Sequence, residues 1–166
     1  MRMETERLVI TELAENMAAE IQRQSQDEAT KRFVPDEVFE TPEAAKKTVL
    51  ELIDAYQSPD GPYVYAVMRE RMLIGYVQLC RIDAGWEVGY HIGEAHRGHG
   101  YASESVGAFL PVIMARLGLQ DVWGVVDERN VVSCRVLEKC GFTMAERGEG
   151  LYHGEVRPRR RYVYSL

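Results

Sequence analysis

This sequence has few cysteines, no net positive charge and no long apolar run. The three cysteines, Cys80, Cys134 and Cys140, form no C-x-x-C pair, so neither a disulfide framework nor a structural zinc site is predicted. The 20 basic and 26 acidic side chains give a formal charge of −6, which argues against broad binding to nucleic acid or anionic membrane. No run reaches the roughly 18 apolar residues of a membrane helix, and the first residues lack a signal-peptide pattern. We therefore expect a cytoplasmic protein.

The remaining composition is that of one folded domain. The chain has 166 residues, of which 46% are hydrophobic and 28% charged, as in ordinary globular proteins. This length is sufficient to bury one core and too short for two domains of usual size. We predict a single domain over residues 1–166, existing as a monomer or a homodimer.

The first half of the chain predicts a strand, two helices and a meander of strands. Alternating polar and apolar residues indicate the strands, and Thr41 followed by Pro42 is typical of a helix start. The expected strands cover residues 6–13, 63–68, 73–82 and 86–92, and the expected helices cover residues 14–26 and 42–56.

The second half alternates helices and strands, which predicts a partly parallel pairing. Apolar residues at helical spacing run from Tyr101 to Leu117, and Gly118 is a natural stop. Pro111 inside this helix should produce a kink. A strand at 121–127, a helix at 130–140, and strands at 142–147 and 159–166 joined by a loop at 148–154 complete a mixed α/β fold around one sheet.

A glycine-rich turn separates the strand at 86–92 from the helix that begins at Tyr101. Its sequence is Arg97-Gly98-His99-Gly100-Tyr101-Ala102. The first N–H groups of a helix have no internal partner and lie at the positive end of its dipole, so they suit a phosphate. Gly98 and Gly100 remove side chains that would block approach, and Arg97 can add a charge-assisted bond. A ligand-free connection is the alternative, since short glycine motifs often match by chance.

These residues resemble the GNAT superfamily of N-acyltransferases, whose signature [RQ]-x-x-G-x-[GA] lies between a strand and a helix. The segments Thr5-Glu6-Arg7-Leu8, Glu87-Val88-Gly89-Tyr90, Asn130-x-x-Ser133 and Leu137-Glu138-Lys139-Cys140-Gly141-Phe142 are similar to its RimJ/RimL-like branch. The resemblance implies a mostly antiparallel sheet with helices on both faces and a V-shaped parallel opening. It also implies acetyl-CoA as co-substrate, contacted by Tyr90, His91, Ile92, the residues of the turn (Arg97, Gly98, His99, Gly100, Tyr101, Ala102), Asn130 and Ser133.

Glu87 is the first candidate for a general base. It lies on a strand of apolar residues and glycine, where burial can raise the pKa of a carboxyl group. The resemblance implies the same role, acting through water on the acceptor amine. Alternation places Glu87, Gly89 and His91 on one face unless a bulge intervenes, so His91 could line the acceptor pocket or serve as the base near its normal pKa. The alternative is that Glu87 is a surface glutamate.

The helix at 130–140 offers two further candidates. The resemblance implies that Asn130 contacts the pantetheine arm and that Ser133 protonates the leaving thiolate. From the residues alone, Asn130 is a good N-cap and Ser133 could be an ordinary helix serine. The oxyanion donor implied by the resemblance is a backbone N–H between Tyr90 and Ile92.

Recognition of the acceptor is less well defined. The resemblance implies that residues 33–39 bind it, with Phe33, Val34, Phe39 and His91 as the candidate side chains. His96 and His99 have no third ligand nearby, so no metal is predicted. A basic run of Arg157, Arg159, Arg160 and Arg161 is either a solvated strand edge or a patch for an acidic partner, and it departs from the branch pattern.

The predicted function is acetyl transfer from acetyl-CoA to a primary amine, by direct attack in a ternary complex. The acceptor is a protein N-terminus, such as that of a ribosomal protein, or an amine-bearing small molecule, and no direct nucleic-acid or membrane partner is expected. A different class of function also stays open, namely a non-catalytic acyl-CoA sensor or protein-interaction module on the same fold. Turnover distinguishes the two.

Overall fold

The computed structural model describes residues 1–152 and 154–166 and is built on one eight-stranded sheet. The strands are β1 (Arg2–Glu4), β2 (Val9–Glu12), β3 (Tyr63–Arg69), β4 (Met72–Ile82), β5 (Gly85–Ile92), β6 (Asp121–Asp127), β7 (Thr143–Tyr152) and β8 (Glu155–Ser165). The α-helices are α1 (Ala18–Gln24), α2 (Glu28–Phe33), α3 (Pro42–Asp54), α4 (Tyr101–Leu117) and α5 (Val131–Lys139). Short 3-10 helices η1 (Glu15–Met17), η2 (Pro35–Glu37), η3 (Ala55–Gln57) and η4 (Glu94–His96) occur in the connections.

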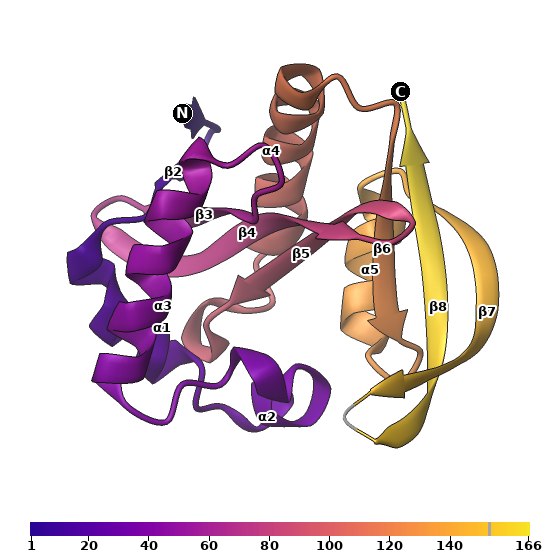
Figure 1. Cartoon of the computed structure of the whole chain (residues 1–166), viewed down its shortest axis with the longest axis horizontal. Helices are drawn as coiled ribbons and strands as arrows, with labels where there is room; N and C mark the ends of the chain where they lie inside the picture. The colour runs from indigo at the N-terminus through magenta and orange to yellow at the C-terminus, as the bar shows by residue number, and fades with distance from the viewer. Residues whose placement is uncertain (153) are drawn as a thin grey trace.

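The sheet is antiparallel except at its centre. The strand order is β1-β2-β3-β4-β5-β6-β8-β7, and β5 with β6 is the parallel pair. The register of β5 with β6 contains one pair, Glu87 with Trp123. In contrast, β5 is paired with β4 along its whole length, from Gly85 opposite Ile82 to Ile92 opposite Gly75. Beyond Glu87, the strand β5 therefore keeps β4 as its partner and diverges from β6 (Figure 1). This confirms the expected V-shaped parallel opening.

Helices cover both faces of the sheet, as expected. Alternate residues of β3 contribute to two separate clusters, because successive side chains of a strand point to opposite faces. Val64 and Ala66 pack with α1 and α3, while Tyr65 and Val67 pack with α4. Both faces of β3 are therefore buried, which explains why this strand is a continuous apolar run.

The helix α4 begins and ends where the sequence predicts. Gly118 takes the left-handed conformation, with φ +65°, and its N–H bonds to the carbonyl of Ala115, as is usual for a glycine that ends a helix. Pro111 lies inside α4; the kink expected there stays a prediction. At α3, the Thr41 hydroxyl accepts a hydrogen bond from the N–H of Ala44, which confirms the predicted cap.

The C-terminal hairpin differs from the prediction. The segment expected as a loop at 148–154 is largely strand, since β7 extends to Tyr152 and β8 begins at Glu155; residue 153 of that segment lies outside the described residues. The register pairs Gly148 with Arg159 and Gly150 with Arg157. Most of β7 is exposed and carries glycines, so it lacks the apolar alternation that marks a half-buried strand.

Two further elements carry weak sequence signals. The strand β1 is only three residues long, and the helix α2 has six. Asp27 caps α2 by accepting from the N–H of Thr30.

No helix among the described residues combines the length and apolar character required to span a bilayer.

Candidate active site

The glycine-rich turn forms an open cradle at the start of α4. Gly98 and Gly100 both have left-handed backbones, with φ +78° and +79°, a conformation that favours glycine. A Cβ on Gly98 would meet no atom within 4 Å. No side chain caps α4, and the carbonyl of Gly100 accepts from Glu104 to close the first turn. The first N–H groups of the helix are thus available to an anionic ligand.

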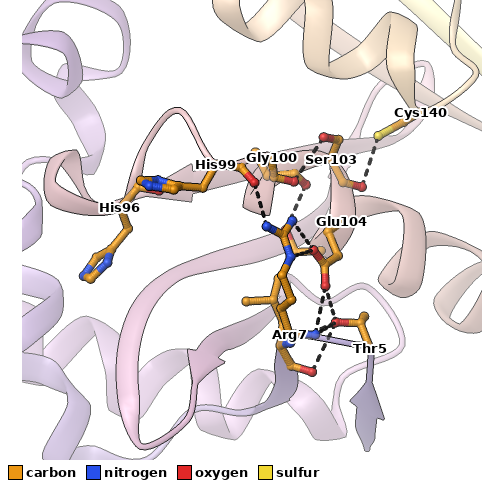
Figure 2. Close-up of polar contacts among 11 residues, drawn as sticks. Thr5, Arg7, His96, His99, Gly100, Ser103, Glu104 and Cys140 are labelled. Atoms are coloured by element: carbon orange, nitrogen blue, oxygen red, sulfur yellow. Dashed lines mark hydrogen bonds and ion pairs between the residues drawn. The ribbon is translucent and has the colours of Figure 1, made fainter.

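Two basic side chains approach this cradle from distant parts of the chain. Arg7 donates from Nη1 to the carbonyl of His99 at 3.0 Å and from Nε to Glu104 at 2.7 Å (Figure 2). The position of a Cβ on Gly100 would lie 3.6 Å from Arg7 Nη2 and 3.8 Å from Lys139 Nζ. Positive charge from Arg7 and Lys139 is therefore concentrated where the helix dipole is also positive.

Arg97 makes two contacts within the protein, and its expected bond to a phosphate stays a prediction. Its Nε donates to the carbonyl of Ile92 at 2.7 Å, and its Nη1 donates to Asp27 at 2.7 Å. The guanidinium therefore ties the end of β5 to the cap of α2. Burial acts to raise the pKa of Asp27, but the bonds from Arg97 and Thr30 outweigh it and hold that pKa at about 2.

A cavity of about 400 Å³ opens between the diverging strands β5 and β6. Among the predicted site residues it brings together Phe33, Val34, Glu87, Tyr90, Asn130 and Ser133. His91, Phe39 and the residues of the glycine turn do not line it. Asp36 and Glu37, from the segment 33–39 expected to bind the acceptor, and Arg157 and Arg159, from the basic run, also line it. The rest of the wall comes from residues that were not predicted as site residues: Gln78, Val88, Gly89, Val125, Val126, Asp127, Leu137, Gly150, Leu151, Tyr152 and Pro158.

Glu87 lies in this cavity at the point where the two strands separate. Burial raises the pKa of its carboxyl to about 7, and the nearby carboxyl of Glu37 acts in the same direction. A hydrogen bond from the backbone of Val125 and the charge of Arg161 oppose the shift. Glu87 can therefore both accept and release a proton near neutral pH, as a general base requires.

Tyr90 of β5 and Asn130 and Ser133 at the start of α5 form a hydrogen-bonded group that also lines the cavity. The Tyr90 hydroxyl lies 2.8 Å from Ser133 Oγ and 2.9 Å from the Ser133 carbonyl oxygen. Asn130 caps α5 by accepting from the N–H of Ser133 at 3.3 Å. Asn130 is thus an N-cap, which confirms that interpretation, and it also lines the cavity; its contact with the pantetheine arm stays a prediction.

His91 shares the face of β5 that carries Glu87 but is buried beneath other elements, with 7% of its surface exposed. Its Nε2 lies 3.0 Å from Thr30 Oγ1, its ring stacks on Tyr76, and its Nδ1 is buried without a partner among the described residues. Burial and the charge of Arg97 lower its pKa to about 4 against the opposing effect of Asp27. The pKa of His91 thus departs from the normal value that was expected, and His91 does not line the cavity; its assignment as a base stays a prediction.

Phe39 also lies elsewhere. Its ring packs with the cluster formed by α1 and α3. Its carbonyl accepts from Gln22 and Gln26, and its N–H donates to Ser25. The part of residues 33–39 that faces the cavity is Phe33, Val34, Asp36 and Glu37.

The side opposite β5 is closed by contacts between α2–η2 and the C-terminal hairpin. The hydroxyl of Tyr152 bonds to Asp36, and Arg157 Nη1 donates to the carbonyl of Arg32 at 3.0 Å. Figure 1 shows α2 lying beside the end of the hairpin, across the mouth of the diverging strands. Segments more than 100 residues apart thus enclose one space, which explains why local sequence patterns did not reveal it.

No group of three or more His, Cys, Asp or Glu side chains suited to a metal ion occurs in the described part of the chain. His96 and His99 are instead joined locally, with His99 Nδ1 3.3 Å from the carbonyl of His96. His99 is exposed within the glycine turn, and His96 is half-buried just before it (Figure 2).

The sequence of this chain matches that of a known protein family. A family model described as the acetyltransferase (GNAT) domain matches residues 7–143, well over half of the chain. This protein belongs to the GNAT acetyltransferase family. It is accordingly an acyltransferase, and the open sheet with helices on both faces is the GNAT fold.

Individual relatives are distant in sequence and close in fold. The curated protein named probable N-acetyltransferase YjcK, from Bacillus subtilis (strain 168), is 28% identical over 141 residues, covering 81% of this GNAT chain and 77% of YjcK. A GNAT-family acetyltransferase from Bacillus anthracis superposes with a TM-score of 0.87 at 20% identity, covering 99% and 98% of the two chains. RimL, a ribosomal L7/L12 alpha-N-protein acetyltransferase in complex with coenzyme A, gives 0.87 at 16% identity, with 100% and 98% covered. At these identities the solved structures establish the fold alone.

Proposed function

We propose that this GNAT protein transfers the acetyl group of acetyl-CoA to a primary amine by direct attack in a ternary complex. The observation that carries the proposal is the cavity between β5 and β6. The lining of this cavity includes a carboxyl group with a pKa of about 7, that of Glu87, and the paired hydroxyls of Tyr90 and Ser133. Acetyl transfer needs a proton acceptor and a proton donor on opposite sides of the reacting carbonyl.

The cofactor would be held at the glycine turn and along the opening. The cradle of Gly98 and Gly100, with free helix N–H groups and the charges of Arg7 and Lys139, fits a pyrophosphate. The pantetheine arm would then run past Asn130 toward the cavity. When bound, acetyl-CoA supplies an activated acetyl group and a thiolate leaving group. A backbone N–H of β5 between Tyr90 and Ile92, free of β6, would stabilise the developing oxyanion.

Glu87 would take the proton that leaves the amine, directly or through a water molecule. The amine nitrogen forms a bond to the acetyl carbon, and the bond between that carbon and sulfur breaks. Ser133 gives its hydroxyl proton to the departing thiolate and can recover one from Tyr90, whose hydroxyl is in contact. The ammonium form of the amine first loses one proton to solvent, and the proton lost on amide formation passes to Glu87. Ser133 supplies the proton of the thiol, and Glu87 returns its proton through solvent to the pair of Ser133 and Tyr90, so the products are the amide and the thiol and the side chains are restored.

The acceptor side of the cavity is lined by Phe33, Val34, Asp36 and Glu37. This mixture of apolar and acidic groups fits an amine that arrives protonated, as most amines do at neutral pH. RimL-like motifs in the sequence and a ribosomal-protein acetyltransferase among the similar folds support a protein N-terminus. An amine-bearing small molecule fits the same lining. We place the enzyme in the RimJ/RimL-like branch, acting in the cytoplasm as a monomer or homodimer.

The experiment is a measurement of CoA thiol release from acetyl-CoA with a panel of amines. The panel includes peptides with free N-termini, amino acids, polyamines and aminoglycosides. Turnover with one class establishes the acceptor, and mass spectrometry should show one acetyl group on its amine. If CoA binds tightly and no amine in a broad panel is acetylated, a non-catalytic acyl-CoA sensor replaces the proposed enzyme.

A further inference from the structure

The basic run at the C-terminus is not uniform. Arg157 pairs with Glu155 at 3.0 Å, Arg160 with Glu128 at 3.0 Å, and Arg161 with Glu146 at 3.0 Å. The side chain of Arg159 makes no hydrogen bond or ion pair with any residue in 1–152 or 154–166. It is the unpaired member of the run, and its side chain lines the cavity.

The position of Arg159 is set by the hairpin. Side chains of β8 alternate, so Arg157, Arg159 and Arg161 share the face that Glu87 occupies, and Arg160 points the other way. The Arg159 stem lies across Gly150 of β7, because a Cβ on Gly150 would stand 2.8 Å from Arg159 Cδ and 3.2 Å from Nη1. Because Gly150 has no side chain, the Arg159 side chain can lie flat along the wall of the cavity instead of projecting from that wall.

Two carboxyl groups that line the cavity, those of Glu37 and Asp36, have neutral partners, and a third, that of Asp127, pairs with Arg129 at 2.7 Å. Glu37 accepts from the Tyr76 hydroxyl at 2.6 Å and from Gln78 at 3.0 Å, and Asp36 accepts from Tyr152. None of these carboxyls pairs with Arg159. One cavity therefore carries a cation on the hairpin wall and acidic groups on the walls formed by η2 and β5.

A half-buried arginine without a protein partner favours an anionic ligand, since its planar fork binds carboxylates in a bidentate manner. The acidic groups at the other wall favour the ammonium form of an incoming amine. We propose that Arg159 binds a carboxylate carried by the acceptor itself, so that the preferred acceptor is an amine with a carboxylate close to it. This inference rests on the proposed function and names its substrate class. The carboxylate can be that of a free amino acid or an acidic side chain near a peptide N-terminus.

The test compares acceptors in matched pairs. A free amino acid is compared with its amide, and a peptide with aspartate at its second position with the asparagine peptide. The wild-type enzyme should prefer the carboxylate member of at least one pair by about tenfold to a hundredfold in kcat/KM, as expected for a charge-assisted hydrogen bond. Which pair shows the preference distinguishes the two sources of carboxylate.

Arg159→Gln should abolish this preference, with a KM for the carboxylate acceptor raised about tenfold or more and kcat/KM for the neutral acceptor unchanged. Arg159→Lys should keep part of it. Arg160→Gln is the matched control, because Arg160 belongs to the same run but points away and pairs with Glu128. The Kd for CoA should be equal in all three variants; a weakened Kd in Arg159→Gln alone would assign Arg159 to the cofactor and overturn the inference.

The outcomes separate the two proposals. Turnover of amines with no preference for a carboxylate, or a preference that persists in Arg159→Gln, overturns the inference and leaves the proposed function standing. Direct titration of the carboxylate acceptors into the CoA complex decides the inference without turnover. A Kd weakened tenfold in Arg159→Gln supports it, whereas equal affinities, or no binding by any member of the panel, overturn it.

Discussion

The hydroxyl of Tyr90 lies 2.8 Å from Oγ of Ser133 and 2.9 Å from the carbonyl oxygen of the same residue. Since a carbonyl only accepts, the Tyr90 proton points to it, and the Ser133 hydroxyl is then free to donate to the Tyr90 oxygen. Burial raises the pKa of Tyr90, and the hydrogen bond with Ser133 opposes this only in part. Tyr90 is therefore neutral at physiological pH. In this arrangement Ser133 donates to Tyr90, so the Tyr90 hydroxyl must turn from the carbonyl to Ser133 Oγ before it can replace a proton that Ser133 has given up.

We expect Ser133→Ala and Tyr90→Phe to lower kcat while the Kd for CoA changes little. Loss of a general acid costs about 100-fold or more. If the two hydroxyls work as one chain, the double variant should be no slower than the slower single variant, because residues that act as a unit are not additive. Pre-steady-state rates and titration of CoA measure both quantities. A Ser133→Ala enzyme with wild-type kcat would contradict the assigned role.

The pH dependence of the rate should report Glu87. With a carboxyl pKa of about 7, the contribution of Glu87 to kcat/KM should rise tenfold per pH unit below pH 7 and level off above it, because the base must be ionised. Glu87→Gln should remove this limb and lower kcat/KM by about 100-fold or more. The acceptor amine titrates identically in both enzymes, so the ratio of their profiles isolates the carboxyl.

Glu37→Gln is the matched control for that profile. Glu37 lies in the same cavity, and its charge contributes to the raised pKa of Glu87. Replacing Glu37 with the neutral amide should move the rising part of the pH profile to lower pH, but the profile should still rise. An unchanged profile in Glu87→Gln would show that another group is the base.

The parts of this site that the sequence predicts are those with local signals. The glycine turn and α4 depend on residues within one segment, and both occur where predicted. Glu87 follows from the alternation along β5, which contains no bulge in its pairing with β4. The raised pKa of Glu87 was also predictable, since its neighbours Trp86 and Val88 are buried.

The remainder depends on contacts between distant segments. The sequence places His91 on the correct face of β5, but α2 covers it with Thr30 and Asp27, and this short helix has almost no periodic signal. Glu37 and Arg159 come from an irregular segment and from a glycine-bearing hairpin. Their meeting in one cavity follows from the tertiary fold, so no spacing within either segment could predict it.

Gly100→Val should abolish CoA binding. Any side chain at Gly100 meets a left-handed backbone and projects toward Arg7 and Lys139, in the space proposed for the pyrophosphate. Gly118→Val is the matched control, because it has φ +65° at the other end of the same helix and open space around its Cβ position. Both variants should lose similar stability, about 1 to 3 kcal/mol, while only the first loses CoA in a titration. Normal affinity in Gly100→Val would exclude the turn as the binding site.

Asp27→Asn should destabilise the end of β5 in a pH-dependent manner. Asparagine can still cap α2, so the change removes chiefly the charge that pairs with Arg97 at 2.7 Å. The folded-state pKa of Asp27 is about 2, below the ordinary value of 3.8. Its contribution is therefore present above pH 4 and lost as pH falls through 2. Because Arg97 is one-third exposed, we expect a loss of only about 1 to 2 kcal/mol at pH 7.

Urea unfolding of both proteins from pH 7 to pH 2 measures this difference. The gap in free energy of unfolding should be constant down to about pH 4 and should then close, since the wild-type carboxyl becomes protonated like the neutral amide. Asp60→Asn serves as the control, because Asp60 is exposed in a turn and its replacement should change stability by less than about 0.5 kcal/mol. A gap for Asp27→Asn that is independent of pH would mean that Arg97 is held by its bond to the carbonyl of Ile92 rather than by charge.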